Sequence, residues 1–532
     1  MKKTFLSVAL GAIFLLALGG AVWTLAKTQQ PPRPPEYNEV VAASKIADLA
    51  ARLKEFERIK AAYPLSTLMS SIDGNIYGLK IEMASSLDTV LALQKDIVGK
   101  GQGFAKMASF LGGAMDIVTH PNLAQFDKAG VLKTVRAYQA EADNLLRDQT
   151  YTQTVPEAQR KFLAEYANNF QIGLAMAHLN ANDSTQALAS LEAYKTAGGA
   201  SDAMYSYTLA ETSMKLNKNA EALAGYMSAA VENYEDAAAK AKAAWIKVNS
   251  KEDGFAAALE AKQKELPYHP AAFKAPAGWK GKTVLAEIFT GSECPPCVAA
   301  DIGFDGLIES VPGQYLAILE YHLPIPRPDP IMNPATGARQ KFYGVNSTPS
   351  TFFDGEAKLG GGGGRANAVT KYGQYVAEIT SRLSEAPAMT LTAKAALAGD
   401  AVKVDITVDK PAAGAEIHVV LVQNEVPYKG SNGIVFHKLV VRDIRTVTAE
   451  APQTVFDLTV SEKATDAYLT EFEKTYTRIP NFKWAERHFN ISRTGLKVVV
   501  FAQDPQTKKV HNAVTVDVKS RDEPSAPPSP VA

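Results

Sequence analysis

The sequence predicts a multidomain protein with an all-α region, then an α/β domain, then an all-β domain. Apolar residues recur every three or four positions over 37–266, as on one face of a helix. Over 387–519 they alternate with polar residues, as in strands. Between these regions, over 275–386, short apolar runs typical of buried strands alternate with helical segments. A chain of 532 residues is long enough to bury several separate cores.

The N-terminus predicts export. Lys2 and Lys3 precede an uncharged, mostly apolar run over 4–26. This layout fits a cleaved secretory signal, and it also fits a retained membrane anchor, because ~20 apolar residues cross a bilayer core. With either reading of 1–27, we expect an extracytoplasmic protein of the periplasm or cell envelope, attached to the membrane if the segment is uncleaved. The Pro-rich stretch 28–36 is expected to be a semi-rigid linker.

The composition excludes some partners. The chain has 56 basic and 56 acidic residues, and this balance gives no indication of nucleic-acid binding. A zinc site needs about four ligands, and two cysteines with eight scattered histidines form no metal signature. We therefore expect neither a metal nor a cofactor. The five glycines of Gly360–Gly364 lack the Lys-Ser/Thr of a phosphate-binding loop, so they are expected to form a mobile loop or hinge.

Within the helical region, two units have related sequences. Leu174-Ala175 followed by Ala187 recurs as Leu209-Ala210 followed by Ala222. This pattern resembles the tetratricopeptide repeat, in which small residues stand where two helices approach closely. A generic helical bundle is the alternative. Stacked repeats form a concave surface, so the helical region is a candidate site for a protein partner, or else it only supports the next domain.

Cys294 and Cys297, separated by two prolines, are the only cysteines. They follow an apolar, strand-like run at 283–289 and a short turn. Exported proteins often contain several stabilising disulfides, whereas this chain can form only one, so the pair is expected to serve chemistry. At a helix N-terminus the dipole favours a thiolate, which makes Cys294 the predicted nucleophile. Cys297 is then placed to resolve the mixed disulfide.

A second motif lies downstream, where Thr348-Pro349 precedes a strand-like run at 351–353. Strand, turn, Cys-x-x-Cys, helix, a later strand and helix, and then this motif together resemble the thioredoxin superfamily. In particular, they look like exported bacterial thiol–disulfide oxidoreductases, some of which carry an immunoglobulin-like domain after the thioredoxin-like one. The resemblance implies that Pro349 is cis and faces the cysteine pair. It also implies that Thr348 pairs with the substrate backbone.

The resemblance is incomplete near the cysteines. Thioredoxin has a tryptophan before the first cysteine, where this chain has Glu293, and a negative charge there raises the pKa of a thiol. Thioredoxin also has a buried acid six positions before that cysteine, where this chain has Ile288. If the turn is one residue longer, Glu287 is the proton acceptor for Cys297. If it is not, Glu287 points to the opposite side of the strand.

A proline-dense loop over 321–330 is a further candidate for recognition. Within it, His322 is predicted to lie near the cysteines and tune them, although a lone histidine is more often structural. Arg327 and Asp329 are weaker candidates. His437 is most simply a strand residue.

The last region is expected to be an antiparallel, immunoglobulin-like β-sandwich, because several short alternating strands are separated by turns. One of its predicted strands is 455–460, and a helical insertion is expected over 464–473. The Ser- and Pro-rich segment 520–532 is expected to be a disordered tail.

Two functions follow as hypotheses. The first is an extracytoplasmic thiol–disulfide oxidoreductase. It would act on a protein or small-molecule disulfide or dithiol and be recharged by a separate redox partner. The second is an envelope scaffold or protein-binding module in which the cysteine pair is only structural. The direction of exchange depends on the reduction potential and on that partner.

Overall fold

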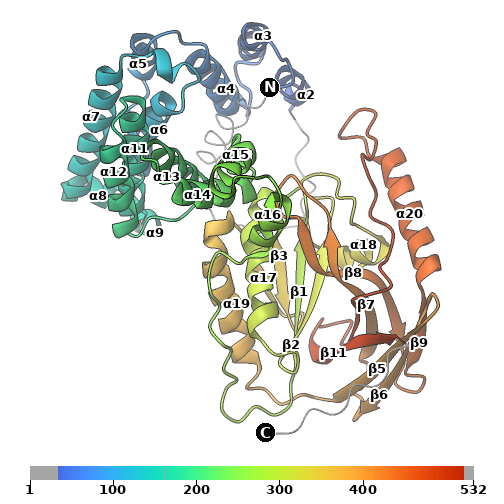
Figure 1. The fold of residues 1–532 in the computed structure, drawn as a ribbon. Coiled ribbons are helices and arrows are strands. Elements are labelled where there is room, and N and C mark those ends of the chain that lie inside the picture. The colour runs from blue at the N-terminus through green and yellow to red at the C-terminus, as the bar shows by residue number, and fades with distance from the viewer. Residues whose placement is uncertain (1–33, 161, 521–532) are drawn as a thin grey trace. The chain divides into compact units, whose positions relative to one another are not determined.

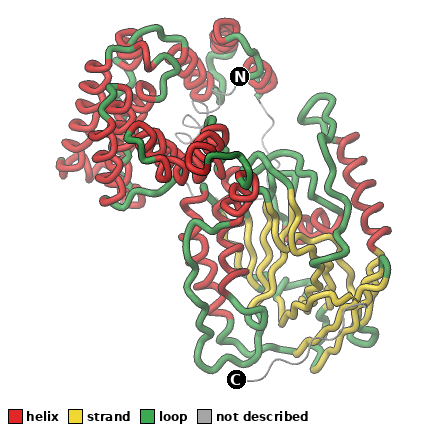
Figure 2. The backbone as a smooth tube through the Cα atoms, viewed as in Figure 1, coloured by secondary structure: helices red, strands yellow, loops and turns green. Residues whose placement is uncertain are grey.

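The computed structural model describes residues 34–160 and 162–520 (Figures 1 and 2). The predicted export segment, most of the Pro-rich linker and nearly all of the predicted tail lie outside these residues. The chain divides into two compact units, Met1–Phe255 and Ala256–Ala532. In the part that is described, no helix is both long and apolar enough to span a bilayer.

The first unit is helical throughout its described residues, as the periodicity predicts. Its elements are α2 (Tyr37–Ala43), α3 (Leu49–Ala62), α4 (Met69–Glu82), α5 (Leu87–Gln94), α6 (Phe104–Val118), η2 (Leu123–Gln125), α7 (Lys128–Arg147), α8 (Gln149–Thr154), α9 (Glu157–Arg160), α10 (Leu163–Asn168), α11 (Phe170–Asn180), α12 (Ser184–Thr196), α13 (Ala203–Lys215), α14 (Asn219–Val231) and α15 (Ala237–Asn249). Helix α16 (Phe255–Lys264) begins at the boundary between the units.

The small residues of the two related helical units lie where helices pack closely. Ala187 and Ala222 are fully buried. An added Cβ at Gly225 of α14 would be 2.7 Å from the backbone oxygen of Ser206 in α13, so a larger residue there would push the two helices apart. The close packing of α13 and α14 therefore depends on small side chains.

The second unit combines a mixed sheet with helices. Its strands are β1 (Val284–Thr290), β2 (Leu316–His322), β3 (Ser350–Phe353), β4 (Ala357–Gly360), β5 (Thr390–Ala398), β6 (Ala401–Asp409), β7 (Glu416–Pro427), β8 (Phe436–Val447), β9 (Gln453–Asp457), β10 (Leu496–Gln503) and β11 (Val510–Ser520). Its helices are η3 (Pro295–Cys297), α17 (Val298–Ser310), α18 (Pro334–Tyr343), η4 (Arg365–Asn367), α19 (Ala368–Arg382) and α20 (Leu458–Thr475).

All strands of this unit belong to one sheet, in the order β4-β3-β1-β2-β8-β7-β10-β11-β5-β6-β9. Strands β1 and β2 are parallel, whereas β3 and β4 form an antiparallel hairpin beside β1. The regions predicted as separate α/β and all-β domains are joined by a parallel pairing of β2 with β8, with Glu320 opposite Val440. The β region is not purely antiparallel, because β11 runs parallel to β5.

Helices cover both faces of the β1–β4 part of the sheet. Phe353 of β3 packs against Phe304 of α17 and Tyr375 of α19, with ring centroids 6.4 and 5.7 Å apart. The neighbouring Phe352 stacks on Tyr343 of α18 at 4.1 Å. Successive strand residues point to opposite faces. Helices α17 and α19 therefore lie on one face, and α18 lies on the other.

One predicted strand in the β region ends early. Strand β9 ends at Asp457, and α20 starts immediately afterwards. The Asp457 carboxylate accepts a hydrogen bond from the backbone N–H of Val460, as an N-cap does. The helix expected over 464–473 consequently begins six residues earlier, at Leu458.

Candidate functional site

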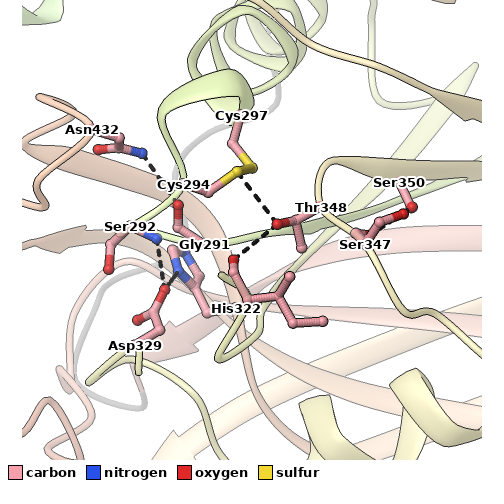
Figure 3. The surroundings of a disulfide bond; sticks show 11 residues. Gly291, Ser292, Cys294, Cys297, His322, Asp329, Ser347, Thr348, Ser350 and Asn432 are labelled. Atoms are coloured by element: carbon pink, nitrogen blue, oxygen red, sulfur yellow. Dashed lines mark hydrogen bonds and ion pairs between the residues drawn. A yellow bond between two sulfur atoms is a disulfide. The ribbon is translucent and has the colours of Figure 1, made fainter. Parts of the chain in front are cut away.

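The two cysteines form a disulfide in the turn between β1 and α17 (Figure 3). Their Cα atoms are 5.3 Å apart. Cys294 is the N-cap of η3, whose first two residues are Pro295 and Pro296, and α17 starts directly after Cys297. Proline suits this position because the first turn of a helix leaves its N–H groups unbonded. Both cysteines are fully buried while the prolines between them are exposed, so the disulfide lies just beneath the surface.

The predicted substrate-binding residues lie beside this disulfide. The Thr348 hydroxyl oxygen is 3.3 Å from the sulfur of Cys294 and 2.9 Å from the backbone oxygen of Ile325 (Figure 3). The Thr348–Pro349 peptide is cis, and Pro349 is buried. The hydroxyl has one proton, so it donates either to the carbonyl or to the sulfur. These contacts place Thr348, and Pro349 next to it, beside Cys294, the predicted nucleophile.

The five-glycine run also contacts the cysteine turn. The backbone N–H of Gly363 donates to the carbonyl of Pro296 at 2.8 Å, and the N–H of Ala299 donates to the carbonyl of Gly363 at 3.0 Å. A Cβ at Gly362 would be 1.7 Å from the Pro296 oxygen and 3.0 Å from the Cγ of Pro349. Glycine is needed here because another chain segment approaches the backbone closely, and the expected hinge is hydrogen-bonded to the turn.

We expect Gly362→Ala to separate the glycine run from the cysteine turn. The inserted methyl group has no space against Pro296, so the second unit should lose about 1–3 kcal/mol of stability. Gly364→Ala is the matched control, because an added Cβ there meets nothing within 4 Å. Hydrogen exchange of α17 amides measures the effect in this unit. Equal losses in the two variants would contradict the close contact at Gly362.

The loop between β7 and β8, residues 428–435, packs against the other side of the turn. The backbone N–H of Asn432 donates to the Ser292 carbonyl at 3.2 Å, and its side-chain amide donates to the Gly291 carbonyl at 3.3 Å (Figure 3). A Cβ at Gly430 would be 2.1 Å from the Ser292 oxygen. The C-terminal β region therefore forms one wall of the cysteine site.

Glu293, the residue before the first cysteine, faces the same loop. One carboxylate oxygen is 3.3 Å from the backbone N–H of Ser431 and 3.4 Å from the hydroxyl of Tyr428. The side chain is only half-buried. Its negative charge is thus directed toward donors of the β7–β8 loop.

His322 supports the residues before Cys294 through a carboxylate. Its Nδ1 is 2.8 Å from Asp329, whose same oxygen accepts the Ser292 backbone N–H at 2.7 Å (Figure 3). Burial alone would lower the pKa of His322, but the charge of Asp329 and hydrogen bonds to Asp329 and Glu320 raise the pKa to about 10. Burial also opposes the charge of Asp329, yet His322 lowers the pKa of that carboxyl. An ion pair therefore anchors the turn.

More ionisable groups lie around His322. Its Nε2 is 2.8 Å from a carboxylate oxygen of Glu320, and its ring meets that of His437 edge-on at 4.7 Å. Burial and the positive charge of His322 lower the pKa of His437 to about 3. Burial and the charge of Glu320 raise the pKa of Asp301, a carboxyl of α17 beside Thr290. All of these side chains are at least nine-tenths buried.

Glu287 does not lie near the cysteines. It stands opposite Phe352 in the β1–β3 register and therefore on the α18 face, away from α17. Its carboxylate accepts hydrogen bonds from Arg339 at 2.7 and 2.9 Å and from Tyr343 at 2.5 Å. Tyr321 donates a further bond at 3.0 Å. The structure therefore does not bring Glu287 and Cys297 together.

Sequence reasoning missed several residues of this site. Glu320 shares a strand face with His322, and Asp301 stands one helical turn after Cys297, so both positions carry a local signal. The β7–β8 loop and His437 are distant in sequence from the cysteines and carry none. Arg327, a weaker candidate, is exposed.

Comparisons with known proteins give no relative for this chain: no protein-family model, curated protein or solved structure matches it significantly.

Proposed function

We propose that the protein is a thiol–disulfide oxidoreductase of the thioredoxin-like class, with Cys294 as nucleophile and Cys297 as resolving thiol. The observation that carries the proposal is the close contact of three parts. The disulfide lies at the end of β1, the Thr348 hydroxyl is 3.3 Å from the Cys294 sulfur, and Pro349 lies against the same turn. A structural disulfide has no need of such a neighbour.

The order of elements supports the same class. Strand β1, the cysteine turn, α17 and β2 are followed by α18, the β3–β4 hairpin and α19, with sheet order β4-β3-β1-β2. This is the succession of elements that the sequence resemblance implies. The tetratricopeptide-like and immunoglobulin-like assignments of the flanking regions belong to the proposal too, as does export by the N-terminal segment.

The proposed chemistry is a two-electron exchange. The Cys294 thiolate attacks one sulfur of a substrate disulfide, which forms a mixed disulfide and expels the other substrate sulfur as a thiolate. The Cys297 thiolate then attacks Cys294, closes the protein disulfide and releases the second substrate sulfur. The substrate is reduced and the protein oxidised, and the reverse sequence oxidises a dithiol. A separate redox partner restores the starting state.

Thr348 has two roles in this scheme. Its hydroxyl donates to the thiolate form of Cys294, and a hydrogen bond to the charged form favours that form. Within residues 34–160 and 162–520, no backbone hydrogen bond involves the N–H or C=O of Thr348. Pairing with an extended substrate segment next to the sulfur requires that these two groups have no backbone partner of their own.

The test is catalysed reduction of insulin disulfides by dithiothreitol, with the full chain. Wild type should accelerate the reaction, whereas the double variant Cys294→Ser/Cys297→Ser should give the uncatalysed rate. Circular dichroism of both proteins controls for folding. If the folded double variant is as active as wild type, the cysteine pair is structural, and the scaffold or binding-module function takes the place of the enzyme.

A further inference from the structure

Three side chains under the cysteine turn place possible metal ligands close together. One oxygen of Glu320, Nε2 of His322 and Nδ1 of His437 all lie within 4.8 Å of one another. The first two residues are on β2 and the third is on β8. Glu320, His322 and His437 are 5%, 0% and 2% exposed, so solvent does not provide hydrogen-bond partners for these ligand atoms. We refer to these three residues as the buried cluster.

In each of the two histidines, the ring nitrogen that is not part of the buried cluster faces an oxygen acceptor. His322 Nδ1 faces the Asp329 carboxylate at 2.8 Å, and His437 Nε2 faces the backbone carbonyl of Tyr428 at 3.1 Å. A carbonyl oxygen only accepts, so Nε2 of His437 carries the proton. In a neutral ring, Nδ1 then presents a lone pair to Glu320, 3.9 Å away. Metal-binding histidines are held in this way, with the far N–H on a carboxylate or carbonyl.

A further buried carboxyl, that of Asp301 on α17, lies in the surroundings of the cluster. Asp301 is 6% exposed, and burial raises its pKa, as does the charge of Glu320, whereas the hydroxyl of Thr290 and the charge of His322 lower it. A buried carboxylate with few donors is costly, and a cation bound nearby would stabilise its charge.

We propose that the buried cluster binds one divalent transition-metal cation, for which Zn²⁺ is the best match. Two imidazole nitrogens and one carboxylate oxygen are a set of three protein ligands that zinc accepts, with a water molecule as the fourth ligand. Calcium and magnesium fit less well, because they take oxygen ligands. The cation displaces the proton that His322 Nε2 shares with Glu320, and this proton passes to solvent.

The position of the site indicates a structural role. Its ligands come from β2 and β8, and Glu320 is also the residue that pairs with β8 where the two parts of the sheet meet. A metal bound here would fasten these parts together directly beneath the cysteine turn. This role is independent of the proposed redox function.

The experiment measures zinc binding by the full chain with its disulfide kept oxidised, so that thiolates cannot contribute. After removal of metal with a chelator, wild type should take up one Zn²⁺ per chain from a competing chelator. Glu320→Gln and His437→Gln should reduce this uptake to background. His418→Gln is the matched control: His418 is also a buried histidine of the sheet, on β7, and it lies outside the cluster.

Asp301→Asn keeps the test decisive if the histidine or glutamate variants do not fold, because it removes only the charge of a carboxylate beside the cluster. We expect it to weaken zinc binding by roughly tenfold or more. Substitution of Co²⁺ in wild type should give the visible absorption of a four-coordinate site. Absence of zinc uptake by oxidised wild type overturns the proposal, as does uptake that remains unchanged in every folded cluster variant and in Asp301→Asn.

Discussion

Replacing Cys297 with serine should leave Cys294 joined to its substrate in a mixed disulfide that accumulates. Without the resolving thiol, the second exchange cannot take place within the protein. Cys294→Ser should accumulate on the order of tenfold less of this adduct, because its remaining cysteine lacks the Thr348 hydroxyl that contacts the first sulfur. Non-reducing electrophoresis and mass spectrometry of adducts with a disulfide-containing model protein measure the difference.

The two single variants control for each other, since each removes one sulfur from the same turn. Release of the adduct by dithiothreitol shows that the link is a disulfide. If Cys294→Ser traps substrate and Cys297→Ser does not, the two roles are exchanged. If neither variant traps substrate, the proposed exchange mechanism is wrong.

Arg339→Met should destabilise the second unit by about 3–5 kcal/mol, because it leaves the Glu287 carboxylate buried without its cation. Arg339 is 4% exposed and Glu287 is fully buried, so water does not screen the charge that remains. The substitution also removes a 2.8 Å hydrogen bond to Gln503 of β10. Hydrogen exchange of β1 and β10 amides reports the loss in this unit separately from the helical unit.

The double variant Glu287→Gln/Arg339→Met should recover part of that stability, since it removes the unpaired charge as well. Arg58→Met is the matched control in the helical unit, where the Arg58 side chain is 50% exposed and 2.8 Å from Glu55. Its effect should be barely measurable, because solvent screens such pairs. A loss at Arg339 as small as that at Arg58 would show that the buried pair contributes little.

Local patterns in the sequence predicted much of this site. The apolar run before the cysteines forms β1, and the run after Thr348-Pro349 forms β3. These predictions held because runs of apolar residues and the positions of prolines are properties of short segments. The helical period of the first unit was recognisable for the same reason.

Other features could not be predicted because they depend on packing between distant segments. The face on which Glu287 lies follows from its register with Phe352. The sequence predicted a hinge at the five glycines, whereas Gly362 among them fits closely against Pro296, a partner that no local pattern reveals. His437 reaches His322 only because β8 pairs beside β2. The early end of β9 depends on a single capping carboxylate, that of Asp457.

The pairing of β2 with β8 limits where the chain can be cut into separately folded fragments. All seven residues of β2 are buried, and β8 pairs at Glu320 with the edge that β1 leaves open. A fragment cut at 386 would therefore expose the backbone of an apolar strand at the margin of its sheet, which is a template for association with other chains. It would also lose the wall that the β7–β8 loop provides for the cysteine turn. A fragment that keeps the surroundings of the cysteine turn intact should thus include β7 and β8.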